Sequence, residues 1–347
     1  MKISKHLAPA IRFIRIRLFA TPLDAVITLA CCWFIARIAP PLVRWPLLDA
    51  SFAGTTRADC TGAGACWVFV RARFGQFMYG FYPVDQRWRV DLTAVIFLAA
   101  AALVASKGLP RRRLIAIALA LVVPIIAVVL LHGGFGLPVV ETRDWGGLML
   151  TIFISLYAAA LAVPLGVVLA LGRQSRLPVI RTLSIVFIEF WRGVPIITVI
   201  FLASLLLPLI VPSGIGVDRL ARAIIGLALV IAAYMAEAVR GGLQAIPKGQ
   251  YEAATALGLR YWRSTGFIVL PQALRIALPA MTNEFIALIK NTSLVLIVSI
   301  LDLLGVAQAA LADPAWVGMT MEAYVFAGSI YWLICFGLSR ASLRLER

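Results

Sequence analysis

Long apolar segments alternate with short polar ones along most of this 347-residue chain. A helix of about 20 apolar residues crosses the hydrocarbon core of a bilayer, and several segments approach or exceed that length. We therefore predict an all-α integral membrane protein with about eight transmembrane helices and with both termini in the cytoplasm. The predicted spans cover residues 24–46, 91–106, 114–131, 148–171, 178–211, 219–242, a segment that contains 280–294, and 324–338.

Basic residues fall in short clusters between the apolar segments. The net charge of +16 could by itself indicate a nucleic-acid partner, but 62% of the chain is hydrophobic and only 14% is charged. Lysine and arginine clusters beside spans mark the cytoplasmic side of a membrane, so we expect no binding of nucleic acid. The span at 24–46 is too long for the core of a cleaved signal peptide. The expected cytoplasmic clusters lie at residues 1–20, 107–113, 173–176 and 340–347.

Residues 47–90 combine glycines, aromatic residues and arginines. We expect them to lie along the outer membrane surface, where aromatic side chains are favoured. Cys60 and Cys66 are six residues apart in what would be an oxidising compartment, and they either form a disulfide or remain two free thiols. The other three cysteines lie within apolar runs. Because the cysteine spacing matches no usual zinc pattern, we expect no metal site.

Residues 243–271 form a polar island between two apolar segments. Charged side chains there cannot enter hydrocarbon without a large desolvation cost, so we expect a loop in the cytoplasm. Pro247 suits the first turn of a helix, and Gly258 can adopt the left-handed conformation that ends one. A second helical piece is expected from about Arg260 to Pro271. The result would be two short helices joined at a glycine, with an alanine-lined surface.

The loop also carries a specific spacing of residues. Its fixed positions are Glu252, Ala253, Ala254, Gly258, Ile268, Leu270 and Pro271. This string resembles the cytoplasmic signature loop of permeases in binding-protein-dependent ABC importers, and every fixed position is present. In that family the loop docks into a cleft on the ATP-hydrolysing subunit. The resemblance implies that this chain is the membrane half of an ATP-driven importer, with a five-helix permease core coupled to ABC ATPase subunits.

The chain shows no sign of being an enzyme. It lacks the Gly-x-x-x-x-Gly-Lys-Ser/Thr loop that binds nucleotide phosphates, so we expect no cofactor in this chain and expect ATP and Mg²⁺ to bind the partner ATPase. The alternative is a secondary amino-acid transporter or ion-coupled channel that uses Glu284 and Glu189 as proton or ion sites. That alternative needs no soluble partner and leaves the spacing within residues 243–271 unexplained.

A second string, Glu-x-x-Arg-Gly-x-Pro, begins at Glu189 in the fifth predicted span. Glu189 and Arg192 are three residues apart on one helical face, close enough to pair. The string resembles the polar amino-acid branch of the permease family, which implies a polar amino acid as substrate. A structural ion pair beside a glycine-proline kink is the favoured alternative. Glu237 and Arg240 repeat the spacing, and we expect them to anchor the loop.

The resemblance extends over nearly the whole chain. Residues 1–145, with their aromatic external segment, resemble the N-terminal part of the larger permeases in bacterial general L-amino-acid importers. This implies a three-helix extension before a core at 146–347, in the bacterial inner membrane and in contact with lipid. Because importers of this type pair two different permeases, we expect a heterodimer with a related chain. A periplasmic amino-acid-binding protein would deliver the L-amino acid.

The seventh predicted span carries the best candidates for a substrate site. Charged side chains within a span are costly and normally face the protein interior, so each suggests a function. Glu284, Leu288 and Asn291 share one helical face, and Asn283 and Lys290 form the adjoining strip. A carboxylate can hold the ammonium group of a zwitterion, while amides, hydroxyls and backbone groups can hold its carboxylate. The candidate substrate residues are Glu284, Asn291, Asn283, Lys290, Thr292, Ser293, Glu189 and Arg192.

Two further expectations concern this span. The family resemblance places substrate contacts along it, and Glu284 has an alternative role as the ion-pair partner of Lys290 or of a residue in the second permease. An amide at position 291, in place of a second acid, favours broad acceptance over selection for cationic amino acids.

Overall fold

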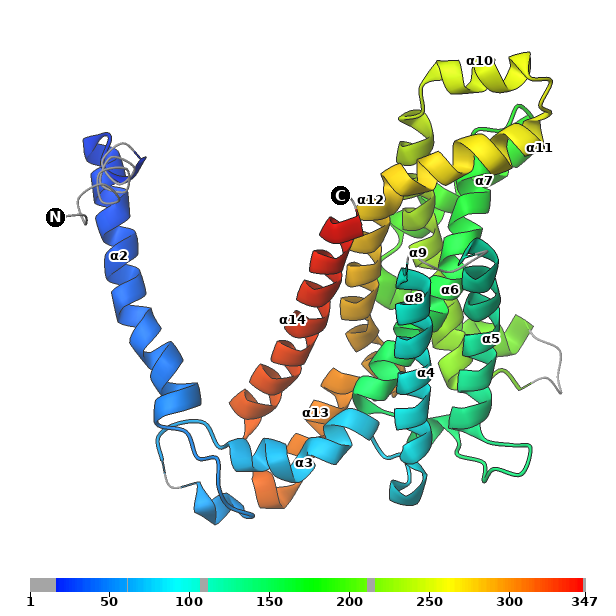
Figure 1. The fold of residues 1–347 in the computed structure, drawn as a ribbon. Helices are drawn as coiled ribbons and strands as arrows, with labels where there is room; N and C mark the ends of the chain where they lie inside the picture. The colour runs from blue at the N-terminus through cyan, green and yellow to red at the C-terminus, as the bar shows by residue number, and fades with distance from the viewer. Residues whose placement is uncertain (1–16, 61, 107–111, 211–215, 346–347) are drawn as a thin grey trace. The chain divides into compact units, whose positions relative to one another are not determined.

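The computed structural model describes residues 17–60, 62–106, 112–210 and 216–345. These residues form helices, turns and isolated bridges, and no extended strand occurs among them, which confirms the all-α prediction (Figure 1). Residues 1–16 of the basic arm, 107–111 of the predicted cytoplasmic hairpin, the predicted span end at 211 and residues 346–347 lie outside the described part of the chain.

The chain divides into two units, Met1–Ala72 with Gly318–Glu322, and Arg73–Val317 with Ala323–Arg347. The first unit contains the apolar helix α2 (Pro22–Val43), which continues as a π-helical turn (Arg44–Leu48). Together these 27 residues are long and apolar enough to cross a membrane, as predicted for the first span. Thr21 and the acidic residue three positions later cap each other's backbone and so start the helix.

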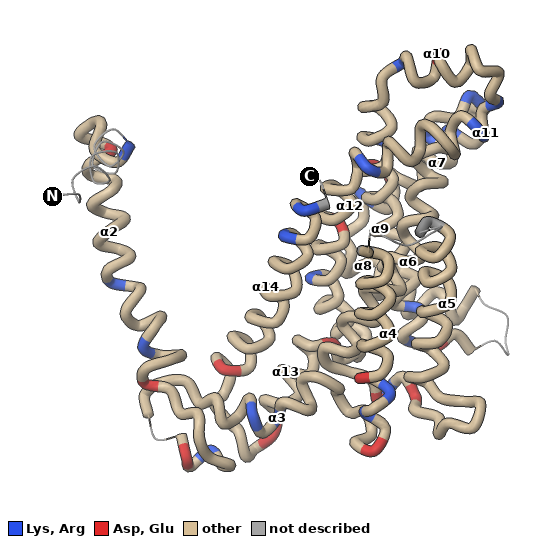
Figure 2. The backbone as a smooth tube through the Cα atoms, viewed as in Figure 1, with Lys and Arg blue, Asp and Glu red and all other residues tan. Residues whose placement is uncertain are grey.

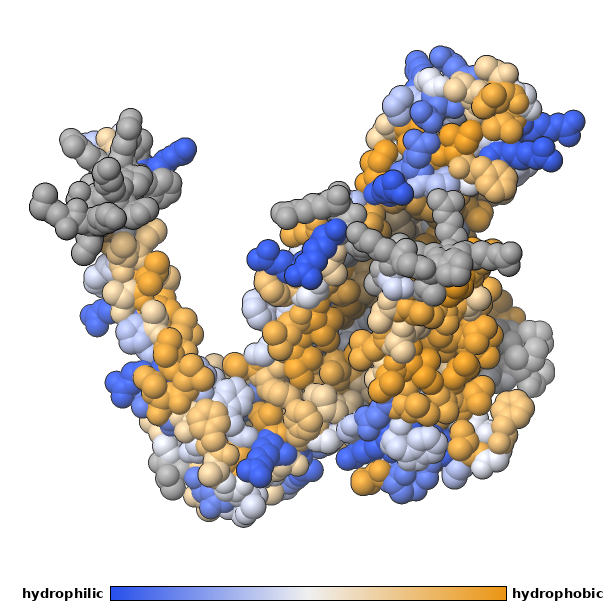
Figure 3. Space-filling view, viewed as in Figure 1, coloured by the Kyte–Doolittle hydropathy of each residue, from blue (hydrophilic) through white to orange (hydrophobic). Residues whose placement is uncertain are grey.

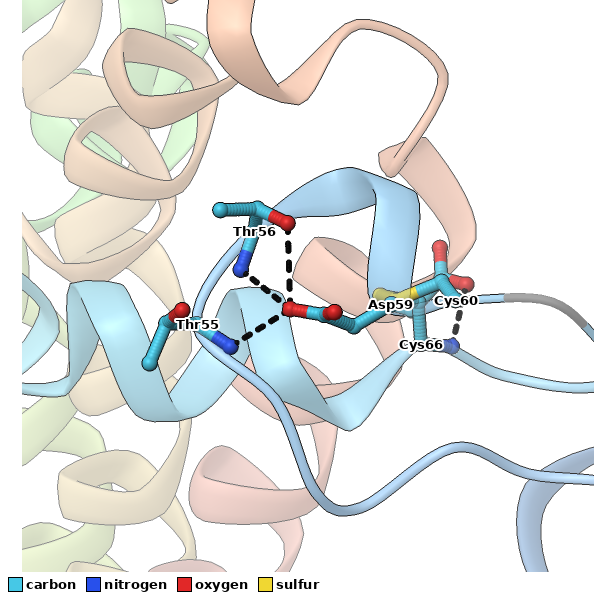
Figure 4. The surroundings of a disulfide bond; sticks show 6 residues. Thr55, Thr56, Asp59, Cys60 and Cys66 are labelled. Atoms are coloured by element: carbon cyan, nitrogen blue, oxygen red, sulfur yellow. Dashed lines mark hydrogen bonds between the residues drawn. A yellow bond between two sulfur atoms is a disulfide. The ribbon is translucent and has the colours of Figure 1, made fainter.

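An external loop of the first unit is held together by a disulfide and a carboxylate (Figure 4). The disulfide joins Cys60 to Cys66, whose Cα atoms are 5.6 Å apart. Oδ2 of Asp59 accepts hydrogen bonds from the backbone N–H groups of Thr55 and Thr56, both at 2.8 Å. These bonds, of which the one from Thr56 is the strongest, lower the pKa of the Asp59 carboxyl.

The same loop is tied to the segment Gly318–Glu322. The buried carboxylate of Glu322 accepts a hydrogen bond from the backbone N–H of Cys66 at 2.9 Å. Helix α3 (Trp67–Tyr79) begins at the next residue. A charged hydrogen bond of this kind satisfies a buried acid that would otherwise be costly.

The second unit is a bundle of long helices around α9 (Arg219–Gln244). The apolar part of α9 is 67% buried, more than in any other candidate span of the described chain. Helix α9 packs against α6 (Gly147–Arg173), α8 (Ile196–Ile210) and α12 (Leu270–Asn291). Apolar side chains cover the sides of the bundle, and charged residues are concentrated toward its two ends, as a bilayer requires (Figures 2 and 3).

Six helical segments among the described residues are long and apolar enough to span a membrane. A seventh span results if α7 (Pro178–Gly193) and α8, which are bent by 107° at their junction, count as one. The sequence predicted one span there and offered a glycine-proline kink within it, and the break between Gly193 and Ile196 accounts for the bend. The remaining expected span corresponds to α4 (Trp88–Ala105), which forms a hairpin with α5 (Arg112–His132).

We predicted that the second helical piece of the polar loop ends at Pro271, and this prediction is wrong. After α11 (Tyr261–Ser264), a π-helical turn (Thr265–Val269) leads directly into α12, and Pro271 lies in the first turn of α12. Proline is tolerated there because the first N–H groups of a helix have no intrahelical partner. The chain continues through a 3₁₀ segment (Thr292–Val298), α13 (Leu303–Leu311) and α14 (Thr320–Leu345).

Helices α6 and α9 approach each other closely at Gly166. A Cβ atom at Gly166 would lie 2.7 Å from Cβ of Met235 and 3.0 Å from the carbonyl oxygen of Ala232. Neither atom is the end of a flexible side chain. The absence of a side chain at Gly166 is therefore what allows the two helices to pack.

We predict opposite effects for the same substitution at two helical glycines. Gly166→Ala should lower the free energy of unfolding by about 1–3 kcal/mol because it overpacks the α6–α9 contact. Gly337→Ala in α14, where no atom lies within 4 Å of the added Cβ, should raise it by about 0.5–1 kcal/mol through better helix propensity. Thermal unfolding of the purified full-length chain in detergent measures both. Equal shifts for the two variants would contradict the packing argument.

Candidate functional site

The polar loop contains a short, well-defined helix, α10 (Lys248–Ala256). It starts directly after Pro247. The turn that ends it contains Gly258, whose φ of +67° is the left-handed conformation that we predicted. The N–H of Gly258 donates to the carbonyl of Thr255 at 2.9 Å, and the N–H of Leu259 donates to that of Ala254 at 3.0 Å. This pair of bonds is a Schellman motif, and it fixes the point at which the chain turns back.

Most of the fixed positions within α10 face outward. Glu252, Ala253 and Gly258 are exposed, whereas Ala254 is buried against the π-helical turn that follows. The three later positions, Ile268, Leu270 and Pro271, are half-buried. The fixed positions therefore form two groups: an exposed one on and just after α10, and a half-buried one at the base of the loop.

A hydrogen bond that we did not predict joins α10 to α12. The side-chain amide of Gln272 donates to Oε1 of Gln250 at 3.1 Å and to the carbonyl of Ile268 at 2.8 Å. The π-helical turn supplies that carbonyl, so the amide ties both arms of the loop together. Two glutamines 22 residues apart give no signal in the sequence.

Large apolar side chains project from this polar loop into the surroundings. Leu257 and Trp262 are each 76% exposed, and Phe267 is 81% exposed. Apolar and charged side chains lie together over α10 and α11 (Figure 3). Exposed apolar side chains on a loop that cannot enter hydrocarbon are typical of a surface that another protein covers.

An ion-pair network joins the helices at the base of this loop. The guanidinium of Arg173, at the end of α6, donates to Oε1 of Glu189 at 3.0 Å and to Oε1 of Glu237 at 2.8 Å. Arg240 binds Glu237 through two nitrogens, at 2.7 and 3.0 Å from Oε2. Arg192 lies 3.8 Å from Glu189. The network connects α6, α7 and α9.

The network contains both pairs that the sequence predicted at three-residue spacing, and in each pair the carboxylate contacts its predicted arginine. No pattern in the sequence indicated Arg173, because its link to Glu189 and Glu237 depends on how three helices pack. Arg192 also lies over the ring of Tyr234, with 5.7 Å between the guanidinium carbon and the ring centroid. These contacts favour a structural role for Glu189.

Glu284 lies on α12 and is half-buried. Within the described part of the chain no ion pair joins Glu284 to Lys290 or to another cation, and Lys290 is exposed. Arg192 of α7 acts on Glu284 only at a distance, beyond that of an ion pair. Asn291 is half-buried and Asn283 is exposed on the same helix. Glu284 and Arg192, both candidates from the sequence, therefore lie within electrostatic reach of each other without a direct contact.

Thr292 and Ser293 lie apart from this group. Thr292 is fully buried, and its hydroxyl donates to the carbonyl of Ile289 at 2.8 Å. Its oxygen also lies 3.4 Å from the hydroxyl of Tyr331 in α14. Ser293 donates to the carbonyl of Lys290 at 2.9 Å. Both hydroxyls thus bond to the backbone of the preceding turn.

Thr292 borders a buried carboxylate that the sequence analysis missed. Asp302 is fully buried; its Oδ2 accepts the hydroxyl of Tyr331 at 2.6 Å, and its Oδ1 accepts the N–H of Gly305 at 3.0 Å at the start of α13. The hydroxyl of Thr151 in α6 accepts the N–H of Leu303 at 3.0 Å. These bonds join α6, α13 and α14. Asp302 is the only charged residue in the apolar run 294–306, and this isolation in the sequence could have identified it as a buried acid.

Comparison with known proteins supports this reading of the loop. The family described as binding-protein-dependent transport system inner membrane component matches residues 162–347, which include α10 and α12. The crystal structure of an amino acid ABC transporter with histidines contains a similar chain, with a TM-score of 0.51, 28% sequence identity, and coverage of 58% of this chain and 91% of that one.

Two relatives match almost the whole chain. The inner membrane amino-acid ABC transporter permease protein YhdY of Escherichia coli is 50% identical, over 99% of this chain and 94% of its own length. The glutamate/glutamine/aspartate/asparagine transport system permease protein BztC of Rhodobacter capsulatus is 36% identical, over 97% of this chain and 93% of its own. The chain belongs to the family of binding-protein-dependent transport system inner membrane components.

Proposed function

We propose that this chain is a permease subunit of an ATP-driven importer that carries L-amino acids across the bacterial inner membrane. The observation that carries the proposal is the loop 243–271, which presents the family's fixed positions on a helix with a defined end and an exposed apolar surface. Its relatives are named as amino-acid permeases. ATP and Mg²⁺ would bind to separate ABC ATPase subunits.

The other partners follow from the same proposal. A periplasmic binding protein would deliver the amino acid, and a second, related permease would complete the pathway as a heterodimer. Residues 1–145 would form an extension to the core at 146–347. The family match, which begins at residue 162, supports a core in the second half of the chain.

The helix α9 offers a direct route from α10 to the candidate substrate residues. Helix α9 ends at Gln244 and α10 begins at Lys248, so that only three residues separate the two helices. Its last turns carry Glu237, which is bound to Arg173 of α6, and Arg173 also binds Glu189 of α7. A displacement of α10 by an ATPase would therefore move α9 and, through these ion pairs, the ends of α6 and α7.

Glu284 and Arg192 have the charges that a zwitterion requires. In the proposed site Glu284 holds the ammonium group of the amino acid, and Arg192 or the amide of Asn291 holds its carboxylate. The exposed Asn283 and Lys290 would contact other parts of the substrate or of the partner permease. We include Thr292 and Ser293 only as lower-ranked candidates, since both hydroxyls bond to the backbone.

The function as a whole is tested by uptake into vesicles that contain the chain with its co-purified subunits and the binding protein. Transport of a labelled L-amino acid should require ATP inside the vesicle, and a panel of basic, acidic and neutral amino acids should compete. ATP-independent uptake driven by a proton or sodium gradient would instead support a secondary transporter.

We predict that Gly258→Asp and Glu252→Lys release the ATPase subunit from the purified complex. The first places a side chain where φ is +67°, at a backbone cost of about 1–2 kcal/mol, and the second reverses a charge on the docking surface. The matched control is Gly136→Asp, at a φ of +92° in a loop with no atom near the added Cβ. Retention of the ATPase by both loop variants, measured by co-purification, would contradict the docking role.

We predict that Glu284→Gln weakens uptake about tenfold or more, since a charged hydrogen bond contributes about 1.5–3 kcal/mol. The complex should still assemble, because no ion pair of Glu284 within the described residues is lost. The control is Asp85→Asn, an exposed carboxylate on the external side. Uptake assays with a concentration series measure the effect; normal uptake by Glu284→Gln would remove this residue from the site.

We predict that Arg173→Gln reduces ATP-driven uptake while the ATPase subunits remain bound. The substitution leaves Glu189 with only the 3.8 Å contact to Arg192 and so loosens α6 and α7 from α9. Arg44→Gln, which removes an exposed ion pair with Asp49, should have little effect. The ratio of amino acid transported to ATP hydrolysed is the measurement. An unchanged ratio in Arg173→Gln would contradict the proposed transmission.

A further inference from the structure

A cavity of about 670 Å³ opens between α5, α6 and α9 on the membrane-spanning part of the second unit. Helix α6 ends at a basic cytoplasmic cluster and α9 leads into the cytoplasmic loop, so the starts of both helices, and the end of α5, lie on the external side. The cavity lies between these external ends. The proposed transport pathway does not use it.

The residues around the cavity are ordered by depth. The polar ones, His132, Glu141, Thr142 and Asp218, come from the external end of α5 and from the loops that precede α6 and α9. Other lining residues, all apolar except for the hydroxyl of Tyr157, come from deeper turns, and the deepest on α6 is Leu161. Fourteen residues separate Leu161 from the start of α6, a depth of about 21 Å along the helix. The cavity therefore fits an amphiphile that lies along the membrane normal.

Water is an unsuitable occupant for the deep part. A buried water needs two to four polar partners, and the deeper walls are formed by side chains such as Phe153, Leu161 and Ile224. The hydroxyl of Tyr157, the polar atom at that depth, already donates to the carbonyl of Pro124 in α5. An acyl chain fills such a space without leaving a polar group unsatisfied.

The rim carries charges that suit one class of lipid headgroup. Oδ2 of Asp218 accepts the hydroxyl of Thr142 at 2.7 Å, and Glu141 lies 3.0 Å from Nε of Arg143. Asp218 and Glu141 are both exposed, so an ammonium group can reach both carboxylates. Arg143 does not line the cavity, but its ion pair with Glu141 holds its guanidinium beside the rim, where it can meet a phosphate. Trp145 lies beside them, at the depth where tryptophan is favoured.

We infer that this cavity is a binding site for a phospholipid with an amine headgroup. Its acyl chain lies against α5, α6 and α9, its ammonium group meets Asp218 and Glu141, and its phosphate meets Arg143. The bound lipid joins the α4–α5 hairpin to the permease core. This inference does not depend on the identity of the transported substrate.

The test is native mass spectrometry of the purified full-length chain, with its co-purified subunits, after equilibration with equal amounts of palmitoyl-oleoyl phosphatidylethanolamine and phosphatidylglycerol. We expect retained phosphatidylethanolamine to exceed phosphatidylglycerol about two- to fivefold, the range expected for exposed ion pairs. Ala221→Trp, which fills the cavity from α9, should remove the retained lipid. Val168→Trp, at a position of α6 that is 65% exposed and outside the cavity, should not.

A second variant separates the headgroup from the fold. Asp218→Asn keeps a residue that caps α9 well but removes the charge, so total lipid should be retained while the preference falls to about one. Equal retention by Ala221→Trp and Val168→Trp would overturn the site. A preference for phosphatidylglycerol in the unaltered chain would overturn the assignment of the occupant.

Discussion

Hydrocarbon offers no partner to a polar group, and this constraint explains where most charged residues of the described bundle lie. Many acids and arginines of the second unit lie toward the ends of the helices, as in the loop around α10, or pair with one another. The five charges that join α6, α7 and α9 form one such group. Asp302, held by Tyr331 and by the start of α13, is another buried charge with its partners provided. Glu284 is half-buried in α12 with no ion pair among the described residues, and for this reason it is a candidate for contact with a substrate.

The same constraint explains how a loop in water can act on a site within the membrane. Polar contacts at the base of the loop join helices that are distant in the sequence. Gln272 joins the two arms of the loop, and Arg173 joins the helix that carries α10 to its two neighbours. The close contact at Gly166 then keeps α6 and α9 moving together. In the proposed mechanism these contacts connect α10 to the polar residues of α7 and α12.

Features that depend on local sequence were predicted well. The apolar helices and the left-handed Gly258 follow from apolar length and the conformational freedom of glycine, whereas the cytoplasmic position of the loop stays a prediction. Features that depend on packing were not. The role of Arg173 and the Gln250–Gln272 bond require three-dimensional proximity between distant residues. The end of the second loop helix was wrongly placed at Pro271, since a proline in a first turn starts a helix as readily as it follows one.

The candidate substrate site shows the same division. Helical periodicity correctly grouped Glu284 with Asn291 on half-buried positions of α12, yet periodicity gave no sign that Thr292 turns into the bundle toward Tyr331. The change from α-helix to 3₁₀-helix at Thr292 alters the angle between successive side chains, so a face drawn for an α-helix no longer applies. A lone acid such as Asp302 in an apolar run is a signal that sequence analysis should include.

The central claim is that α10 lies in the cytoplasm and seats against an ATPase. The most direct test uses the Ala253→Cys variant of a chain whose three free cysteines have been replaced. The cysteine at position 253 is then labelled with a membrane-impermeant maleimide. The account predicts no labelling in intact spheroplasts, labelling in inside-out vesicles, and protection in those vesicles when the ATPase subunit is present. Labelling from the outer side, or labelling that the ATPase does not reduce, would contradict it.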